Sequence, residues 1–501
     1  MKNNFKILIG TLSVLFFATS CEQEFLDQSP TGAIITSEQL GEGIELNPKL
    51  GEATLTGLYA TMFTTGTGGI GGAYDFGHKA HDIWGDMLSG DMALTLSTFG
   101  WYRSDITEFQ APTDFTRNNN YMVWRYHFRI INLANLVIES LGGSDFVPET
   151  QDAKNSMGQA LAMRAYGYFY LSQYMINDVE ASWQSATLPI YTTPGFEGAA
   201  RSTTKEVYEF MENDLTKAIE YLDGYSRPTK TQIDKPIAQT LLAYVLGSRR
   251  DRWSDVVSLT TSALAGSSAS PMTTDDSING ILGGFNDVNS QSWMWGVDLN
   301  ADIGLGLTSW WGKMDYFSYS YAAYGDNKGM DSGLYESMKP DDVRRGQFYN
   351  VPGRNYLQPL FKFYDSDRVP QGTSTIVKAD YIYMRYEEPM LLRIEALAQS
   401  GQEGQAKSSL KDFVATRVSD TSYIDALSGA ALLNEIQLQT RLEFWGEGKS
   451  YLAMKRFKST YTRGDNHVSF PGTTYSYNDE RLTFEIPLQE IQNNLNINDQ
   501  N

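Results

Sequence analysis

Long segments with a helical spacing of apolar residues constrain the fold of this chain more than any other sequence feature. Their connections are short and polar or rich in glycine, so we expect successive helices to pack as antiparallel pairs. The sequence therefore predicts a mainly α protein: a tetratricopeptide-like helical-pair scaffold that carries long irregular loops and a few short strands. The clearest apolar faces are Trp124, Phe128, Ile131 and Ile138; Met163, Gly167, Tyr170 and Leu171; and Val207, Phe210, Met211, Leu215, Ala218 and Leu222.

Two loop-rich insertions interrupt the helical pattern, at about 66–114 and 266–375. There Gly, Asn, Asp, Ser and aromatic residues replace the helical period, and short alternating runs such as SWMWGVD predict isolated strands. We expect one body at 49–501, with helical blocks at about 118–265 and 376–457. Further expected elements are helices at 236–248, 254–265, 388–400, 405–418 and 429–444, a helix start at Ser202 to Thr204, and a strand at 381–385.

The N-terminus has the pattern of a bacterial lipoprotein signal. Two lysines flank the start of an apolar run at 7–18 that is too short to span a bilayer, and small residues in FFATSC precede Cys21. We expect a signal peptide at 1–20, lipid on Cys21, and a Pro- and Gly-punctuated spacer at 21–48. The alternative is an ordinary signal peptide with an incidental cysteine. No later segment approaches eighteen apolar residues, so the mature chain is expected outside the membrane on a lipid anchor.

Composition argues against several classes of function. The chain has 40 Lys and Arg against 60 Asp and Glu, a net charge of −20 that would repel a nucleic-acid backbone. One cysteine and four histidines suit a structural zinc site poorly. His78 and His81 form an H-x-x-H motif without a third nearby ligand of that kind. We therefore expect no nucleic-acid partner and no metal.

Two further motifs are best interpreted as loops or turns that bind no ligand. The G-x-G-x-x-G in GTGGIGG follows no alternating strand, so it predicts a turn and no dinucleotide cofactor. Asp326, Asn327 and Asp331 could offer oxygens to calcium, but their spacing is not that of a helix-loop-helix site. We expect a solvated loop there.

Acidic residues could support glycoside hydrolysis, which requires two carboxyl groups across a cleft. Asp82, Asp86 and Asp91 lie in DIWGDMLSGD, and the first two share a helix face, where solvated or capping roles are commoner. We therefore expect no catalytic residue and no enzymatic activity. Other charged residues lie in otherwise apolar helices and are expected to pair with one another or with helix ends; they are Arg164, Arg441, Glu443, Glu447 and Lys455.

Aromatic residues are the positive signal: the chain has 30 Tyr, 24 Phe and 10 Trp, many of them clustered in the two insertions. A sugar ring presents an apolar C–H face that stacks on an indole or phenol ring. Most of these rings are expected to be core, including Trp293 and Trp295 on one strand face. Trp310 and Trp311 are consecutive, so on an extended chain one ring would point outward. We predict a ligand surface where the Phe99–Tyr102 loop meets the 310–324 region, with Trp101, Tyr102, Trp310 and Trp311 as its binding residues.

Seven segments, taken in order, resemble the SusD/RagB family of nutrient-binding outer-membrane lipoproteins. They include CEQEFLDQSP, VWRYHFRIINLANLVIE, QALAMRAYGYFYLSQYM, RSTTKEVYEFMENDLTKAIEYL, YIYMRYEEPMLLRIEALAQSGQ, EIQLQTRLEFWGEGKSYLAMKRFK and FEIPLQEIQNNLNINDQN. The departures are Pro389, where such proteins usually continue a helix, and the GEGKSYLAMKRF string. The resemblance implies a cell-surface lipoprotein that captures oligosaccharide and acts as the lid of a SusC-like TonB-dependent transporter. A peptide-binding member of the family and, less favoured, a surface glycoside hydrolase are the alternatives.

Overall fold

The computed structural model describes residues 49–71, 74–195, 197–273, 285–300, 303, 305–315, 320–353, 355–363 and 379–501. The predicted signal peptide at 1–20, the lipidation site Cys21 and the spacer at 21–48 lie outside the described residues. Within the described ranges, no helix is long and apolar enough to cross a membrane.

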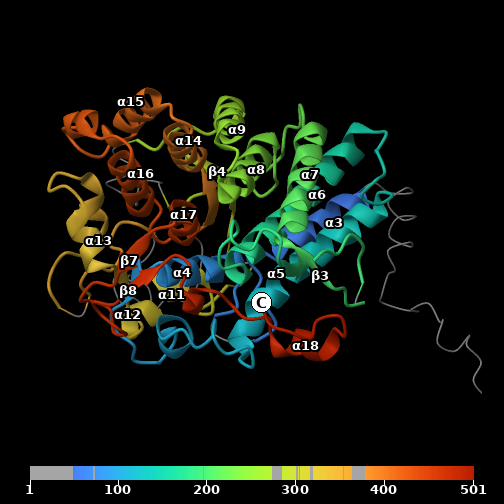
Figure 1. The fold of residues 1–501 in the computed structure, drawn as a ribbon, viewed down its shortest axis with the longest axis horizontal. Helices are drawn as coiled ribbons and strands as arrows, with labels where there is room; N and C mark the ends of the chain where they lie inside the picture. Colours follow the sequence, from blue (N-terminus) through green and yellow to red (C-terminus); the bar gives the residue numbers. More distant parts are fainter. Residues whose placement is uncertain are drawn as a thin grey trace, which may run out of the picture.

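The first helical block is a row in which each helix packs against the one before it (Figure 1). The mainly α prediction is confirmed, and the expected starts and ends agree with the observed ones to within a few residues. A short antiparallel pair of strands, β2 (Ala186–Pro189) and β3 (Arg201–Thr203), links two of these helices. The helices are α5 (Asn118–Ser140), α6 (Gln151–Met175), α7 (Thr204–Tyr221), α8 (Lys235–Arg249) and α9 (Trp253–Gly266).

The second helical block continues the same array. Helix α14 (Glu387–Gln399) packs against α9 and α8, although more than a hundred residues separate it from α9 in sequence. Helices α15 (Glu403–Val414), α16 (Ala430–Glu443) and α17 (Lys449–Phe457) follow it. Pro389 lies in the first turn of α14, where a missing backbone N–H costs no helical hydrogen bond.

The two insertions meet through short strands. In the first, β1 (Met92–Leu94) pairs antiparallel with β5 (Lys328–Met330) of the second, with Ala93 opposite Gly329. The predicted strand at 381–385 is confirmed as β6 (Tyr381–Arg385), which pairs with β4 (Trp293–Val297) and returns the chain to the helical array. The other elements are α3 (Lys49–Ala60), the π-helix η2 (Arg103–Thr107), α11 (Trp310–Met314), α12 (Tyr321–Tyr324), α13 (Ser332–Ser337), the 3-10 helices η5 (Val343–Gln347), η6 (Ser422–Ala426) and η7 (Glu480–Leu482), β7 (Thr460–Thr462), β8 (Thr474–Ser476) and α18 (Leu488–Asn493).

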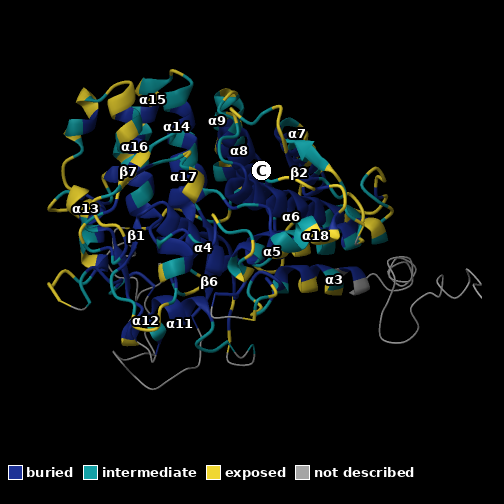
Figure 2. Cartoon of the chain, turned by 60° about the horizontal axis from the view of Figure 1, so that its bottom comes forward, coloured by how far each residue is buried: buried dark blue, intermediate teal, exposed yellow. Residues whose placement is uncertain are grey.

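Helix α4 (His78–Leu88) lies in the first insertion, and every one of its residues is buried (Figure 2). The solvated or capping role expected of Asp82 and Asp86 is therefore wrong. Asp82 lies 3.2 Å from His78 Nε2 and 2.6 Å from Lys79 Nζ. Although burial raises the pKa of Asp82, these neighbours hold it below its usual range. Asp86 Oδ2 accepts hydrogen bonds from the backbone N–H groups of Gly446 and Gly448.

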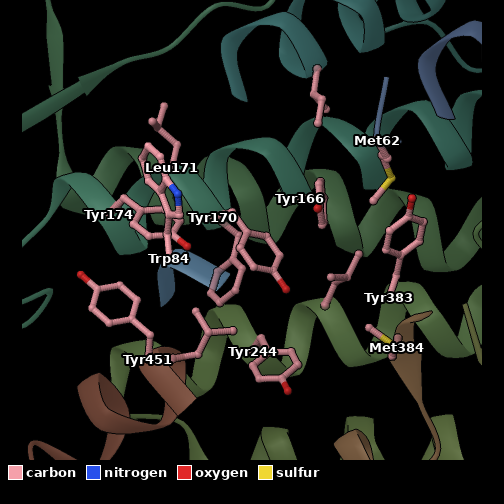
Figure 3. Packing of buried hydrophobic residues seen from close by; sticks show 14 of the residues in the cluster. Met62, Trp84, Tyr166, Tyr170, Leu171, Tyr174, Tyr244, Tyr383, Met384 and Tyr451 are labelled. Carbon is pink, nitrogen blue, oxygen red and sulfur yellow. The ribbon is translucent and has the colours of Figure 1, made fainter. Parts of the chain in front are cut away.

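Tyrosines fill much of the core between α4, α6 and the second block (Figure 3). Tyr174 stacks on Tyr451 with ring centroids 5.5 Å apart and donates a hydrogen bond to the carbonyl of His81 at 2.7 Å. Burial of a tyrosine is tolerated where its hydroxyl has such a partner. The large aromatic content of the chain is therefore in good part a packing feature, as expected for most of these rings.

The charged residues singled out in apolar helices are paired, as predicted. Arg164 binds Asp214 at 2.7 Å, and Arg441 binds Asp91 at 2.6 Å. Lys455 Nζ donates to backbone carbonyls at the end of α6, including that of Ile176 at 2.7 Å. Glu443 and Glu447 both bind Arg385 at 2.8 Å, and further arginines surround Glu443.

Candidate functional site

An exposed aromatic shelf, which we define as Phe99, Trp101 and Tyr321, lies where the two insertions meet. The ring centroids of Trp101 and Tyr321 are 4.0 Å apart, and Phe99 lies 6.2 Å from Trp101 and 5.6 Å from Tyr321. Phe99 is 48% exposed, and the other two rings are partly buried. The shelf therefore offers apolar ring surface to solvent while its edges pack on the protein.

Backbone pairing between the insertions holds the shelf together. Thr98 N–H donates to the carbonyl of Gly325 at 2.8 Å, and Phe99 N–H donates to Asp326 Oδ1 at 3.1 Å. Tyr321 is the first residue of α12, which is capped by Ser320, whose hydroxyl accepts from Ala323 N–H. The shelf is thus held by hydrogen bonds from the backbone of one insertion to the backbone and a carboxylate of the other.

A buried amine supports the underside of the shelf. Lys313 Nζ lies 2.9 Å from the ring centroid of Trp101 and 4.0 Å from that of Tyr321. Burial lowers the pKa of Lys313 to about 5, so the amine is neutral at pH 7 and the contact is not a cation–π interaction. Lys328 lies beneath Tyr102, and burial lowers its pKa to about 7.

The oxygen-bearing side chains near α13 lie inside the protein. Asp326, Asn327 and Asp331 are all buried, so the expectation of a solvated loop is wrong. Asp331 caps α13 by accepting from Leu334 N–H at 2.8 Å, and it also binds His467 Nε2 at 3.1 Å. Asp331 therefore has a structural role, in the cap of α13 and in the contact with His467.

A groove of about 780 Å³ lies beside the shelf and is called the shelf groove below. Thr98 connects the two, because it lines the groove and precedes Phe99. Tyr324, from the same helix as Tyr321, is 40% exposed and also lines it. The other lining residues are Thr95, Leu96, Gly353, Tyr356, Asp465, Asn466, His467 and Val468. The groove therefore combines two phenol rings with hydroxyl, amide and carboxylate groups.

Of the four residues predicted to bind ligand, only Trp101 has exposed surface. Trp310 and Trp311 are 1% and 0% exposed, and they form the first turn of α11, which is capped by Ser309, whose hydroxyl accepts from Gly312 N–H. In this helix both rings reach the core, so the expectation that one ring would point outward is wrong. Tyr102 is also buried, and its ring packs 4.7 Å from Tyr74. These three rings therefore belong to the core and offer no surface to a ligand.

Trp293 and Trp295 are buried in β4, as predicted from their shared strand face. The sequence placed Phe99 and Tyr321 in the aromatic clusters but did not single them out. It carried no signal for Tyr356 or the 465–468 segment, because these residues join the groove only through folding. Residues 316–319, which lie within the predicted ligand region, are outside the described part of the chain.

The two histidines of the H-x-x-H motif point to different partners. His78 contacts the hydroxyl of Tyr166 and the carboxylate of Asp82, and His81 Nδ1 donates to the carbonyl of Gly77 at 3.3 Å. The residues that the structure describes contain no group of three or more His, Cys, Asp or Glu side chains arranged to hold a metal ion.

Comparison with solved structures shows the same fold in several Bacteroides proteins. A SusD-like carbohydrate binding protein from Bacteroides vulgatus ATCC 8482 is 21% identical, with 89% of this chain and 96% of that chain covered and a TM-score of 0.73. A SusD superfamily protein from Bacteroides fragilis is 24% identical, with 90% and 99% covered and a TM-score of 0.71. One from Bacteroides thetaiotaomicron VPI-5482 is 20% identical, with 90% and 98% covered and a TM-score of 0.71.

Two family models match this chain, whereas no curated protein matches it. A model described as starch-binding associating with outer membrane matches residues 71–245, and a model of the SusD family matches residues 317–501. The matched ranges contain both helical blocks apart from the last turn of α8 and all of α9, and they include the shelf residues and the shelf groove. Taken with the shared fold, these matches show that the chain belongs to the SusD/RagB family.

Proposed function

We propose that this protein is a lipid-anchored, cell-surface glycan-binding protein that captures oligosaccharide and delivers it to a SusC-like TonB-dependent transporter, acting as its lid. One observation carries the ligand part of the proposal: the exposed shelf of Phe99, Trp101 and Tyr321 beside the shelf groove. No described feature of the site suggests chemistry on the ligand.

The shelf suits a sugar because it offers apolar ring surface, although its rings are tilted against one another: the Trp101 plane lies at 45° to Phe99 and at 56° to Tyr321. The C–H face of a pyranose ring can stack on Trp101 or Phe99, while its hydroxyls point sideways. Thr98, Asp465 and Asn466 of the groove can donate to or accept from those hydroxyls. A groove of about 780 Å³ has room for a ligand of several rings.

The membrane part of the proposal rests on family membership and on the N-terminal sequence. The matched model is described as associating with outer membrane, and Cys21 follows a lipoprotein-type signal. Several acyl chains on Cys21 would anchor the protein stably. The transporter partner follows from the resemblance to SusD proteins, which act with SusC-like barrels.

The ligand is tested by calorimetric titration of the chain from residue 22 onward with panels of neutral oligosaccharides and of peptides. We expect binding to at least one oligosaccharide and its loss or weakening in Trp101→Ala. Trp183→Ala is the matched control, because Trp183 is also partly buried but lines a different groove. Binding of peptides alone would favour the peptide-binding alternative, and sugar binding that Trp101→Ala leaves unchanged would place the site elsewhere.

The anchor is tested separately with Cys21→Ala in cells that lack the transporter. Cys21 lies before the described helices, so we expect a folded but unlipidated protein that is released from the outer membrane. Retention of this variant in the membrane fraction would contradict the anchor without bearing on ligand binding.

The hydrolase alternative has little support from the site. Asp82 and Asp86 are buried, and Asp82 already binds His78 and Lys79. We expect no measurable cleavage of any glycan that binds. Turnover that Asp82→Asn or Asp86→Asn abolishes would favour the enzyme instead.

A further inference from the structure

A second groove, of about 410 Å³, lies between α5, the segment after β2, and α18, and is called the α5 groove below. Trp124 and Phe128 from α5 and Tyr191 from the opposite wall form an aromatic floor. Phe128 lies 4.7 Å from Trp124 and 5.5 Å from Tyr191, measured between ring centroids. In Figures 1 and 2, α18 and α5 lie apart from α12, so this groove is separate from the aromatic shelf.

Buried and partly buried polar side chains hold the walls of the α5 groove in place. Asn135 is fully buried and donates to the carbonyls of Tyr191 and Thr193 at 3.0 and 3.3 Å. Its oxygen accepts from Arg164, which in turn binds Asp214. On the α18 side, Glu490 accepts from Trp124 Nε1 at 3.1 Å and from Asn494 Nδ2 at 2.8 Å. The groove is thus preformed, which lowers the entropy cost of binding a ligand.

Two arginines at the α5 groove have no anionic partner. Arg125 and Arg129 are four residues apart on α5, both exposed and both lining the groove. Arg125 lies over the ring of Tyr121 at 5.9 Å. Among the arginines of the described ranges, these are the two with neither an ion pair nor a hydrogen bond. In a chain with 60 acidic and 40 basic residues, such unpaired guanidinium groups are unusual.

The groove beside Trp183 and Trp253 provides a contrast. It is of similar size, about 530 Å³, and it too combines aromatic rings with arginines. There, however, Arg249 binds Glu212 and Asp251 at 2.9 Å, and Arg250 binds Glu180 at 3.3 Å. The arginines of that groove are therefore already neutralised, whereas those of the α5 groove remain available.

We propose that the α5 groove is a second sugar-binding site that favours an acidic ring, one that carries a carboxylate or a sulfate group. The ring would stack on the aromatic floor, and Arg125 and Arg129 would bind the anionic group through paired N–H donors. Two carboxylates, Glu197 and Glu490, also line the groove and would weaken the attraction for an anionic group. Both oxygens of Glu490 already accept hydrogen bonds from the protein, and Glu197 is exposed at the rim.

The test is calorimetric titration of the chain from residue 22 onward with three tetrasaccharides of similar size. Tetragalacturonate carries only carboxylates, a sulfated galactan tetrasaccharide carries only sulfates, and galactotetraose is neutral. We expect at least one acidic ligand to bind more tightly than galactotetraose, with an affinity that falls as salt is raised. Comparison of the affinities of the two acidic ligands shows whether the groove prefers a carboxylate or a sulfate group. Binding of neither acidic ligand at millimolar concentration, or equal binding of all three, would overturn the proposal.

Charge variants test the role of the arginines. Arg125→Gln/Arg129→Gln should weaken binding of the acidic ligand by about tenfold or more, because two charge-assisted contacts are lost. Arg250→Gln/Arg481→Gln is the control, since it removes the same charge from two arginines, one partly buried and one exposed, that pair with carboxylates elsewhere. Glu197→Gln should strengthen binding by removing a negative charge from the rim. Equal weakening in both double variants would indicate a general charge effect and no site.

The same titrations in a Trp101→Ala chain keep the two sites apart. Because the α5 groove shares no lining residue with the aromatic shelf or the shelf groove, acidic-sugar binding should be unchanged there. Loss of acidic-sugar binding in Trp101→Ala would assign that binding to the shelf and contradict a second site.

Discussion

Trp101 and Trp311 are large aromatic residues of the two insertions, but only Trp101 keeps exposed surface. If Trp101 stacks on sugar, Trp101→Ala should weaken binding by about 1–3 kcal/mol, by analogy with stacking on nucleic-acid bases, and change the melting temperature little. Trp311→Ala should instead destabilise the fold by about 3–5 kcal/mol, because it leaves a cavity. Thermal melting and glycan titration on both variants check this. Early melting of Trp101→Ala with unaltered affinity would identify Trp101 as a packing residue.

The buried amine of Lys313 should lower the stability of the folded protein at pH 7. Its pKa in the folded protein is about 5, whereas in the unfolded chain it is near that of free lysine, so between these values only the unfolded chain holds the proton. Its burial therefore lowers stability at pH 7, and this cost shrinks as pH rises towards 10.5. Lys313→Met should raise the free energy of unfolding at pH 7 by roughly 2 kcal/mol. Denaturant unfolding at pH 7 and 10 measures this, and a loss of stability at pH 7 would mean that the amine is charged and paired.

Helix α7 shows how a single element is specified locally. Thr203 accepts a hydrogen bond from Glu206 N–H, and the Glu206 carboxylate accepts one from Thr203 N–H, which completes a capping box. Thr203→Ala should therefore lower the free energy of unfolding by about 1 kcal/mol. Thr216→Ala, at an exposed position inside the same helix, is the control and should change little. Equal denaturation midpoints for the two variants would show that the cap does not contribute.

The stability of the whole molecule should fall in acid because of two buried histidines, one on α4 and one on α5. The rings of His81 and His127 are 4.8 Å apart, both are buried, and Nε2 of each has no hydrogen-bond partner. Burial lowers the pKa of His127 to about 3 and that of His81 well below its usual value. Below about pH 6.5 the unfolded chain takes up protons that the folded chain cannot, so stability should fall as pH decreases.

The variant His127→Gln tests this dependence. It should lose stability at pH 7 but show a shallower decline between pH 6 and pH 4, by up to about 1.4 kcal/mol per pH unit. Guanidinium denaturation at a series of pH values provides the measurement. A slope as steep as that of the parent chain would mean that the acid sensitivity arises in other groups.

The helical array could be predicted because its determinants are local. Apolar residues at a 3.6-residue spacing and a threonine cap indicate α5, α6 and α7 wherever they lie in space. The same logic located the strand at Tyr381–Arg385 and the pairing of Arg164. Sequence patterns predicted the wrong environment for α4. This helix is buried on every side although it carries several polar and charged residues, and its aspartates resemble those of a solvent-facing helix.

The candidate site could be predicted only in outline. Composition and the clustering of aromatic residues predicted an aromatic surface in the two insertions. The segments that resemble SusD/RagB proteins predicted a nutrient-binding function. Which rings face solvent depends on where β1 meets β5 and on the short helix α11, which turns both Trp310 and Trp311 inward. Sequence by itself thus determined the helical scaffold and the family, since spacing and motifs act along the chain. Only the tertiary structure brought Trp101 to Tyr321 and left Arg125 and Arg129 unpaired, because exposure and pairing depend on neighbours that are remote in sequence.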